Sequence, residues 1–289
     1  MSRVALVSSV FLVLASSAAA QPAQVEARAE RLGDTTIKVT TRWEADGDGE
    51  ARLSIGGDAT RIHSGGGVAA TLARGHERVL VAYEVDAQRD PFRVRVVSRE
   101  GGRARLSEEV RIARPSSRHD LPFSVAATAT PRGFTVFFQE VQEDDPSAAH
   151  TYMVQLDAEG SVEGMAREVA IPWSLADAIW NGAGYHLALI YPGNGQGMRL
   201  SMVSTTPEGS PQQHPDWASA AGMVMDVHLA RAGERILAFY ADGGAILESD
   251  VTQIRGWGSE PPRAQRRGRI SGDETIVLDG PRPRTVRAR

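Results

Sequence analysis

Two aspartates stand at matching positions of the sequence and could do acid–base or cation chemistry. Asp177 lies seven residues before Gly184. Asp226 lies seven residues before Gly233, and His228 follows two residues later. Carboxylates held near one another can take different protonation states or share a cation. We therefore treat Asp177, Asp226 and His228 as candidate catalytic residues, the alternative being polar residues at strand edges that bond to neighbouring backbone.

A second candidate pair, His119 and Asp120, lies in the loop sequence PSSRHDLPF. Loops that lead into strands commonly carry binding and catalytic groups. Adjacent side chains of an extended strand point to opposite faces, however, so neighbours in sequence need not act together. His119 and Asp120 are candidate catalytic residues, and hydrogen bonding within the loop is the alternative.

Two tryptophans precede expected inner strands and could stack against sugar rings. Trp173 and Trp217 are therefore candidate ligand-binding residues. An aromatic ring offers a large apolar face, which suits the CH groups of a carbohydrate. Trp180 instead stands opposite Leu229 when the two stretches are aligned on their glycines, which favours packing in the core.

The sequence contains no motif that indicates a metal site or a cofactor. The acidic run EADGDGE, residues 44–50, resembles a calcium loop in its oxygen spacing, but it lacks the remaining ligands of an EF-hand and falls where a hairpin turn is expected. The chain has no cysteine, which excludes thiolate metal sites and thiol catalysis. It also has no G-x-S-x-G, H-E-x-x-H or P-loop motif. We predict no metal site and no cofactor.

The N-terminus has the pattern of a secretory signal peptide. Within residues 1–20, Arg3 precedes an apolar stretch and then the small residues Ala18-Ala19-Ala20. This pattern predicts cleavage before Gln21 and export to the periplasm or the cell exterior. No other segment approaches the ~20 apolar residues of a spanning helix, so we expect no transmembrane span.

Charge is distributed unevenly along the chain. The net charge is −4, yet residues 261–289 carry eight arginines against three acidic residues. The remainder is therefore acidic, which argues against nucleic acid as a partner because phosphate binding needs a basic face on the folded part. The basic tail, residues 281–289, could contact an anionic envelope surface, and a solvated tail is the alternative.

A repeat indicates which elements must position these residues. Four stretches, VAATLARG, AATATPRG, DAIWNGAG and DVHLARAG, end in glycines that are 58, 51 and 49 residues apart. Each glycine is followed by an apolar run that reaches an aromatic residue. We expect each glycine to supply the positive φ of a hairpin turn between two strands. A period near fifty residues is typical of a repeat architecture.

Each period contains short alternating or apolar runs that indicate strands, and no window predicts a long helix. Four antiparallel strands in about fifty residues is the pattern of one propeller blade. The N-terminal segment fits a shorter blade, which makes about five. The chain thus resembles the β-propeller superfamily over roughly residues 25–280, although it matches no specific family motif.

We therefore expect an all-β chain with a single β-propeller domain over residues 21–280, and a β-sandwich is the alternative. Near the end, RISGDETIVL is similar to RLGDTTIKV of the first unit. This segment could complete the first blade or begin a truncated sixth one.

The resemblance implies that the loops leading into the inner strands gather at one mouth of a central channel. We expect an exported, non-catalytic binding or scaffold module that recognises a protein or glycan through this loop face. The alternative is a glycan-active hydrolase or lyase that uses mouth carboxylates such as Asp177 and Asp226. The fold supports either class of function.

Overall fold

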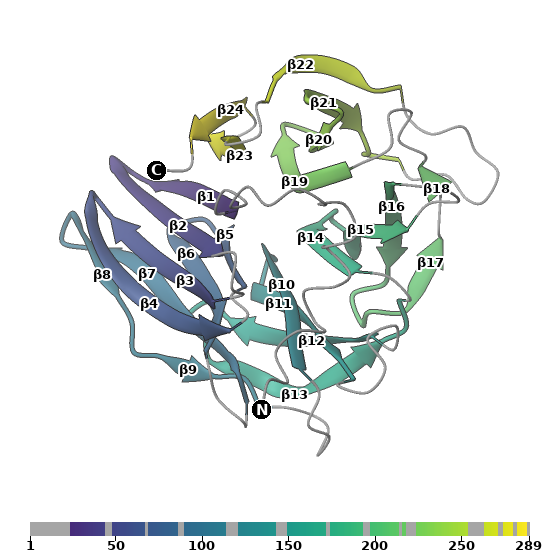
Figure 1. Cartoon of the computed structure of the whole chain (residues 1–289). Coiled ribbons are helices and arrows are strands. Elements are labelled where there is room, and N and C mark those ends of the chain that lie inside the picture. The colour runs from purple at the N-terminus through teal and green to yellow at the C-terminus, as the bar shows by residue number, and fades with distance from the viewer. Residues whose placement is uncertain are drawn as a thin grey trace, which may run out of the picture.

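The computed structural model describes residues 24–43, 48–66, 69–85, 90–113, 121–142, 149–171, 174–192, 197–213, 216–217, 224–253, 263–270, 274–279 and 282–287. Throughout these residues the regular elements are strands, and all strand pairs are antiparallel. Five four-stranded sheets are arranged radially around a centre, which confirms a β-propeller of five blades (Figure 1).

In each blade the strands run in chain order from the centre to the rim (Figure 1). The first blade contains β1 (Gln24–Leu32), β2 (Thr35–Trp43), β3 (Asp48–Ile55) and β4 (Asp58–Gly66). The second contains β5 (Ala70–Arg74), β6 (Arg78–Glu84), β7 (Phe92–Glu100) and β8 (Arg103–Leu106), with the short β9 (Val110–Arg111) also paired to β7.

The other three blades follow the same order. The third contains β10 (Leu121–Ala129), β11 (Gly133–Val141), β12 (Ala149–Asp157) and β13 (Val162–Val169). The fourth contains β14 (Ser174–Trp180), β15 (Tyr185–Pro192), β16 (Met198–Thr205) and β17 (Pro211–Gln213), with β18 (Asp216–Trp217) also paired to β16. The fifth contains β19 (Val224–Ala232), β20 (Arg235–Asp242), β21 (Ala245–Asp250) and β22 (Gln265–Arg269).

A C-terminal hairpin occupies the space between the fifth and first blades. Its strands, β23 (Glu274–Asp279) and β24 (Arg282–Arg287), form a separate two-stranded sheet. β23 lies beside β1 and also contacts β19, so the hairpin is a truncated sixth unit rather than a strand that completes the first blade (Figure 1). Residues 282–287, which the sequence assigned to a basic tail, are therefore part of the ring in β24.

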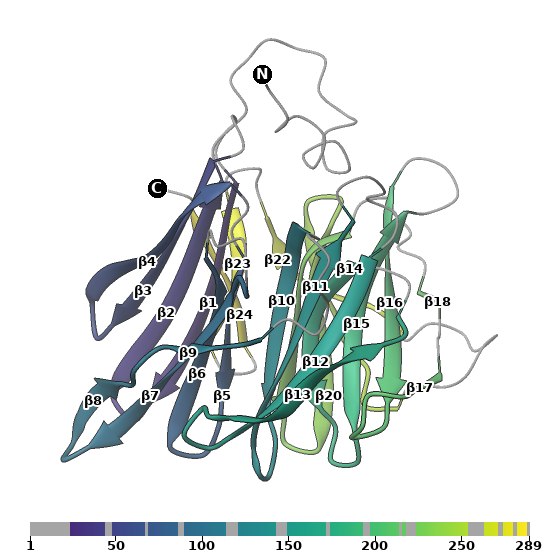
Figure 2. The ribbon, with the colours of Figure 1, turned by 90° about the horizontal axis from the view of Figure 1, so that it is seen from below.

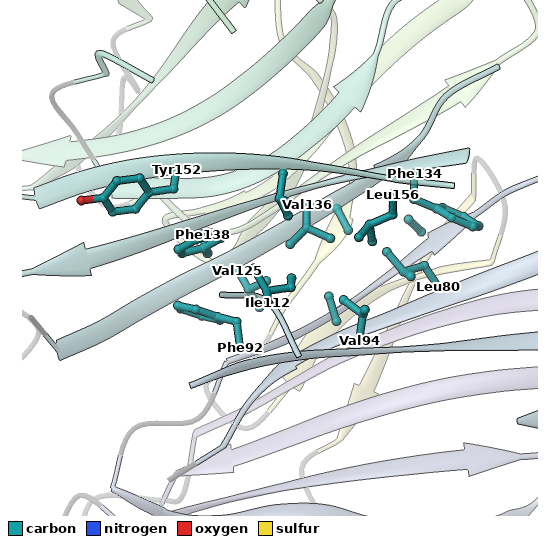
Figure 3. Packing of buried hydrophobic residues seen from close by; sticks show 14 of the residues in the cluster. Leu80, Phe92, Val94, Ile112, Val125, Phe134, Val136, Phe138, Tyr152 and Leu156 are labelled. Atoms are coloured by element: carbon teal, nitrogen blue, oxygen red, sulfur yellow. The ribbon is translucent and has the colours of Figure 1, made fainter. Parts of the chain in front are cut away.

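Each pair of neighbouring blades shares an apolar core. Between the second and third blades the core includes an aromatic series in which Phe92 lies 4.6 Å from Phe138, and Phe138 lies 5.4 Å from Tyr152 (Figure 3). The middle strands β6 and β11 are buried along almost their whole length because a blade packs against a neighbour on both faces. This explains why the sequence shows continuous apolar runs there.

The repeated turn glycines are required for two different reasons. Gly233 has a φ of 63°, as expected for a hairpin turn. Gly75, Gly133 and Gly184 do not have a positive φ, so the expectation was wrong for these three. A Cβ on Gly133 would lie 2.3 Å from the Leu156 carbonyl oxygen, and one on Gly184 would lie 2.0 Å from that of Thr205. At these two positions the close approach of the third strand excludes a side chain.

Candidate functional site

The centre of the ring is bridged by an ion pair between blades on opposite sides. Arg28 on β1 donates from Nη1 to Oδ1 of Asp177 on β14 at 2.8 Å. Its Nη2 donates to the Ala176 carbonyl oxygen at 3.3 Å. The side chains of Arg28 and Asp177 are only 12% and 4% exposed. Because β1 and β14 face one another across the centre, these bonds connect the first and fourth blades directly (Figure 1).

Asp177 also holds the backbone of two inner strands. Its Oδ1 accepts a hydrogen bond from the Ala178 N–H at 2.8 Å. Its Oδ2 accepts one from the Leu229 N–H on β19 at 2.7 Å. The register of β14 against β15 shifts between Leu175 and Asp177. One carboxylate therefore joins the first, fourth and fifth blades.

The other inner-strand candidates lie on β19. His228 is buried, 2% exposed, and pairs in register with Phe239. The side chain of Asp226 lies outside the described part of the structure. Asp177 and His228 thus stand on neighbouring inner strands, whereas a pairing of Asp177 with Asp226 remains a prediction.

Three further predicted site residues, His119, Asp120 and Trp173, lie outside the described residues. Trp217 ends β18, where its backbone pairs with Leu200, but its side chain lies outside the described part. Their roles stay predictions.

Trp180 is half-buried and packs against the apolar core, in line with the packing role that the sequence predicted. Its ring lies 5.1 Å from that of Tyr185 at an interplanar angle of 71°. Its backbone N–H donates to Thr128 Oγ1 on the third blade at 2.9 Å. The residue therefore stabilises the interface between the third and fourth blades.

The two faces of the ring differ in their connections. We define the loop face as the side of the ring on which the first strand of each blade begins and the second strand of each blade ends. The opposite side carries mostly tight turns, such as Gly33-Asp34 between β1 and β2 and Gly101-Gly102 between β7 and β8 (Figure 2). At the loop face the strands are separated by longer stretches of sequence, as between β9 and β10 and between β11 and β12. Variable loops on a rigid scaffold are a common place for binding residues.

Three buried acidic residues lie at the loop-face ends of second strands, and the sequence analysis missed them. Glu84, Glu140 and Asp242, on β6, β11 and β20, are 3%, 0% and 4% exposed. Buried charges require partners, so these are specifically placed groups. The signal that could have found them is an acidic residue within two positions after the aromatic residue, which occurs in three of the four repeated apolar runs.

An ordered polar cluster lies at the loop-face end of the second blade. Tyr83 donates from its hydroxyl to Glu109 Oε2 at 2.5 Å, and Arg93 Nε lies 3.2 Å from Glu109 Oε1. Burial, reinforced by Glu109, raises the pKa of Tyr83. Arg93 also donates to the carbonyl oxygen of Asp90, which has a φ of 49°. The carboxylate of Glu109 is 45% exposed and held in a defined orientation.

A second polar cluster lies at the loop-face end of the third blade. His150 donates from Nδ1 to Glu168 Oε1 at 2.8 Å and accepts at Nε2 from the Gln142 amide at 3.1 Å. The His150 ring is stacked with that of Tyr152 at 6.4 Å and 24°. The cluster combines an aromatic ring with a carboxylate and an amide, and the last two groups suit hydrogen bonds with hydroxyl groups.

Within the described ranges, no group of three or more His, Asp or Glu residues is arranged to hold a metal ion. The same part of the chain contains no helix long and apolar enough to cross a membrane.

Comparison with known proteins finds only distant structural similarities. No family model and no curated protein matches the chain. Solved structures that match include the SapL1 lectin in complex with α-methyl fucoside, at 16% identity over 92% of this chain and 87% of that one, with a TM-score of 0.46. Another is the α-L-arabinofuranosidase from Lactobacillus brevis, at 10% identity over 89% and 92% of the two chains, with a TM-score of 0.46.

A further match is the xylan β-1,4-xylosidase from Bacillus halodurans, at 13% identity with a TM-score of 0.47. It involves 68% of this chain and 41% of the xylosidase, so the chain spans less than half the length of that enzyme. At such identities and TM-scores the similarities carry no information on ligand or activity. The class of protein is a β-propeller, and its function must be argued from its own residues.

Proposed function

We propose that the protein is a non-catalytic β-propeller that recognises a glycan through its loop face. The observation that carries this proposal is the complete engagement of Asp177. Both of its oxygens accept hydrogen bonds from Arg28 or from backbone N–H groups of the inner strands. The carboxylate is therefore used to hold the ring together.

This engagement argues against the hydrolase or lyase alternative. A general acid or base must reach the substrate within hydrogen-bond distance and exchange a proton with it. The Asp177 side chain is 4% exposed and is neutralised by Arg28. A pair of carboxylates flanking a glycosidic bond would require Asp177 to be open to the channel.

The ligand class follows from the chemistry of the loop face. The stacked rings of His150 and Tyr152 lie beside Glu168 and Gln142, which offer a carboxylate and an amide. Sugars present apolar CH faces and hydroxyl groups. The Tyr152 ring is buried in the core, so the partly exposed His150 ring is the aromatic group that a sugar can reach, next to the carboxylate of Glu168. The predicted ligand-binding residues Trp173 and Trp217 would add aromatic faces on the fourth blade.

A glycan array tests the proposal on the chain without its predicted signal peptide. We expect specific glycan binding that the Trp173→Ala/Trp217→Ala variant weakens by about tenfold or more. Met165→Ala is a control, because Met165 is an 84% exposed apolar residue on the outer strand β13. Absence of any glycan binding, together with capture of a protein ligand by the loop face, would contradict the choice of glycan.

A screen of glycoside and polysaccharide substrates tests the non-catalytic part. We expect no turnover by the wild-type protein. Robust turnover that Asp177→Asn abolishes, while the variant stays folded, would overturn the proposal and favour a glycan-active enzyme.

Export is also part of the proposal, on the basis of the pattern in residues 1–20. Mass spectrometry of the protein produced with its full N-terminus should find a mature chain that begins near Gln21. An intact Met1 on protein retained in the cytoplasm would contradict it.

A further inference from the structure

The outermost strand of the fifth blade carries a row of positive charge. We define the basic rim as Arg263, Arg266, Arg267 and Arg269, which lie on or next to β22 and are all exposed. Residues 263–270 contain no acidic side chain. The rim thus contrasts in sign with the acidic remainder of the chain.

One arginine of the basic rim forms an ion pair that holds β22 to β21. Within the described part of the chain the other three form no ion pair and can contact a ligand. Arg267 donates from Nε and Nη2 to the two carboxylate oxygens of Glu248, both at 2.6 Å. The register of β21 against β22 shifts next to this pair, between Ile246 and Leu247. Among the described residues, no ion pair involves the other three arginines of the rim, Arg263, Arg266 and Arg269.

Among the strands that the structure describes, the outermost ones of the other blades do not carry a comparable row of unpaired charges of one sign. β4 carries Asp58 and Arg61, β13 carries both acidic and basic residues, and β17 carries no charge. β8 has two arginines, but Arg105 is paired with Glu100 at 2.8 Å. Charged residues on an edge strand prevent edge-to-edge association, yet that purpose is served by either sign. A separate reason is needed for the basic rim.

The C-terminal hairpin is also rich in arginine in its sequence. β24 contains Arg282, Arg284 and Arg287, and it is the outer strand of the two-stranded sheet. Figure 1 shows β22 and β24 following one another along the outer edge of the ring.

We propose that the basic rim binds a linear anionic polysaccharide. An extended strand rises about 3.3 Å per residue, so Arg266 and Arg269 are about 10 Å apart along β22, and Arg263 precedes the strand. Guanidinium groups bind carboxylates in a bidentate geometry, which suits uronate sugars. A row of charge along one narrow edge of the protein fits a linear polymer better than a flat surface. The rest of the protein is acidic and would be repelled by an anionic membrane. This surface is separate from the loop face, so the inference goes beyond the proposed function.

The test measures binding of the chain without its predicted signal peptide to immobilised polygalacturonate. The variant Arg263→Gln/Arg266→Gln/Arg269→Gln should bind at least about tenfold more weakly, since three exposed charge contacts are removed. The control Arg61→Gln/Arg103→Gln/Arg132→Gln removes the same charge from exposed positions on other blades and should bind as the wild type does. Added salt should weaken binding because the contacts are exposed.

Other probes separate this site from alternatives. Dextran, a neutral chain, should not bind at the basic rim, and the Trp173→Ala/Trp217→Ala variant should retain polygalacturonate binding. Equal loss in the rim variant and the control would show a general charge effect and overturn the inference. Binding to vesicles of phosphatidylglycerol and phosphatidylcholine without binding to polygalacturonate would also overturn it, as would no binding to either.

Discussion

Arg28 and Asp177 are 149 residues apart in sequence, yet their side chains meet at 2.8 Å across the centre of the ring. The first blade is thereby tied to the fourth, and through Leu229 to the fifth. Neighbouring blades are held together by shared apolar cores, whereas this ion pair joins two blades that are not neighbours. It also leaves the carboxylate with structural partners on both oxygens.

Removal of either member of this pair should destabilise the protein. Asp177→Asn leaves the Arg28 charge buried without its counter-charge, and we expect a loss of about 3–5 kcal/mol in the free energy of unfolding. Urea unfolding measures this loss as a shift of the midpoint. The double variant Arg28→Met/Asp177→Asn should lose less than the two single variants together, because it leaves no buried charge behind. Strict additivity would show that the two side chains do not interact.

The turn glycines should differ in their tolerance of a methyl group. Gly133→Ala and Gly184→Ala would place Cβ against a backbone carbonyl oxygen, so we expect each to cost about 2–3 kcal/mol. At Gly75, the matching position of the second blade, a Cβ would lie 3.2 Å from the Phe134 ring, which can move. Gly75→Ala should therefore cost less. Thermal unfolding of the three variants checks this order, and a similar cost at all three positions would contradict it.

The C-terminal hairpin should contribute to the stability of the whole ring. Ile276 on β23 is fully buried and packs with Ala241 and Ile246 of the fifth blade. Ile276→Ala should lower the free energy of unfolding by about 2–4 kcal/mol in a single cooperative transition. The control Met165→Ala, at an exposed position, should change it by less than about 0.5 kcal/mol. A loss confined to a separate early transition would mean that the hairpin is not part of the cooperative unit.

His186 should make stability depend on pH. It lies 4% exposed between the fourth and fifth blades, where Nδ1 is 3.0 Å from Ser204 Oγ and 3.2 Å from Asn181 Nδ2. Its Nε2 is 3.5 Å from the Thr252 carbonyl oxygen. Burial lowers the pKa of His186 below its ordinary value of 6.5, despite the opposing hydrogen bond to Thr252. The folded protein therefore holds this ring neutral.

Because the unfolded chain binds this proton more readily, stability falls as pH drops below about 6.5 towards the lowered pKa of the folded state. His186→Gln removes this contribution, so its unfolding free energy should decrease less than that of the wild type between about pH 7.5 and about pH 5. Urea unfolding at several pH values measures the two slopes. Identical slopes would mean that His186 does not titrate differently in the folded and unfolded states.

Much of the fold could be predicted because blade formation depends on local patterns. The run RVLVAYE of β6 is apolar on successive residues, since both faces of the blade are buried. The tight turn at Gly233 requires a positive φ, which glycine adopts freely. Such signals lie within a few residues of each other and recur with each blade.

The candidate site was predictable only in part. Trp180 was assigned to the core from its register, and it packs against the core residue Tyr185. Asp177 was predicted as a candidate catalytic residue, but nothing in the sequence around Arg28 indicates that Arg28 is its partner. Glu84, Glu140 and Asp242 were missed because an acidic residue after an apolar run is also typical of an exposed turn.

The sequence by itself therefore determined the β-strands and their period, because burial on both faces of a blade leaves a pattern within each repeat, and it favoured a propeller over a β-sandwich. Only the tertiary structure decided that β23 and β24 fill a truncated sixth position and that Gly133 and Gly184 are excluded from carrying a side chain by the third strand. It also decided that Asp177 meets Arg28. These contacts join residues far apart in the chain, so they depend on how the ring closes and not on the local pattern of either partner.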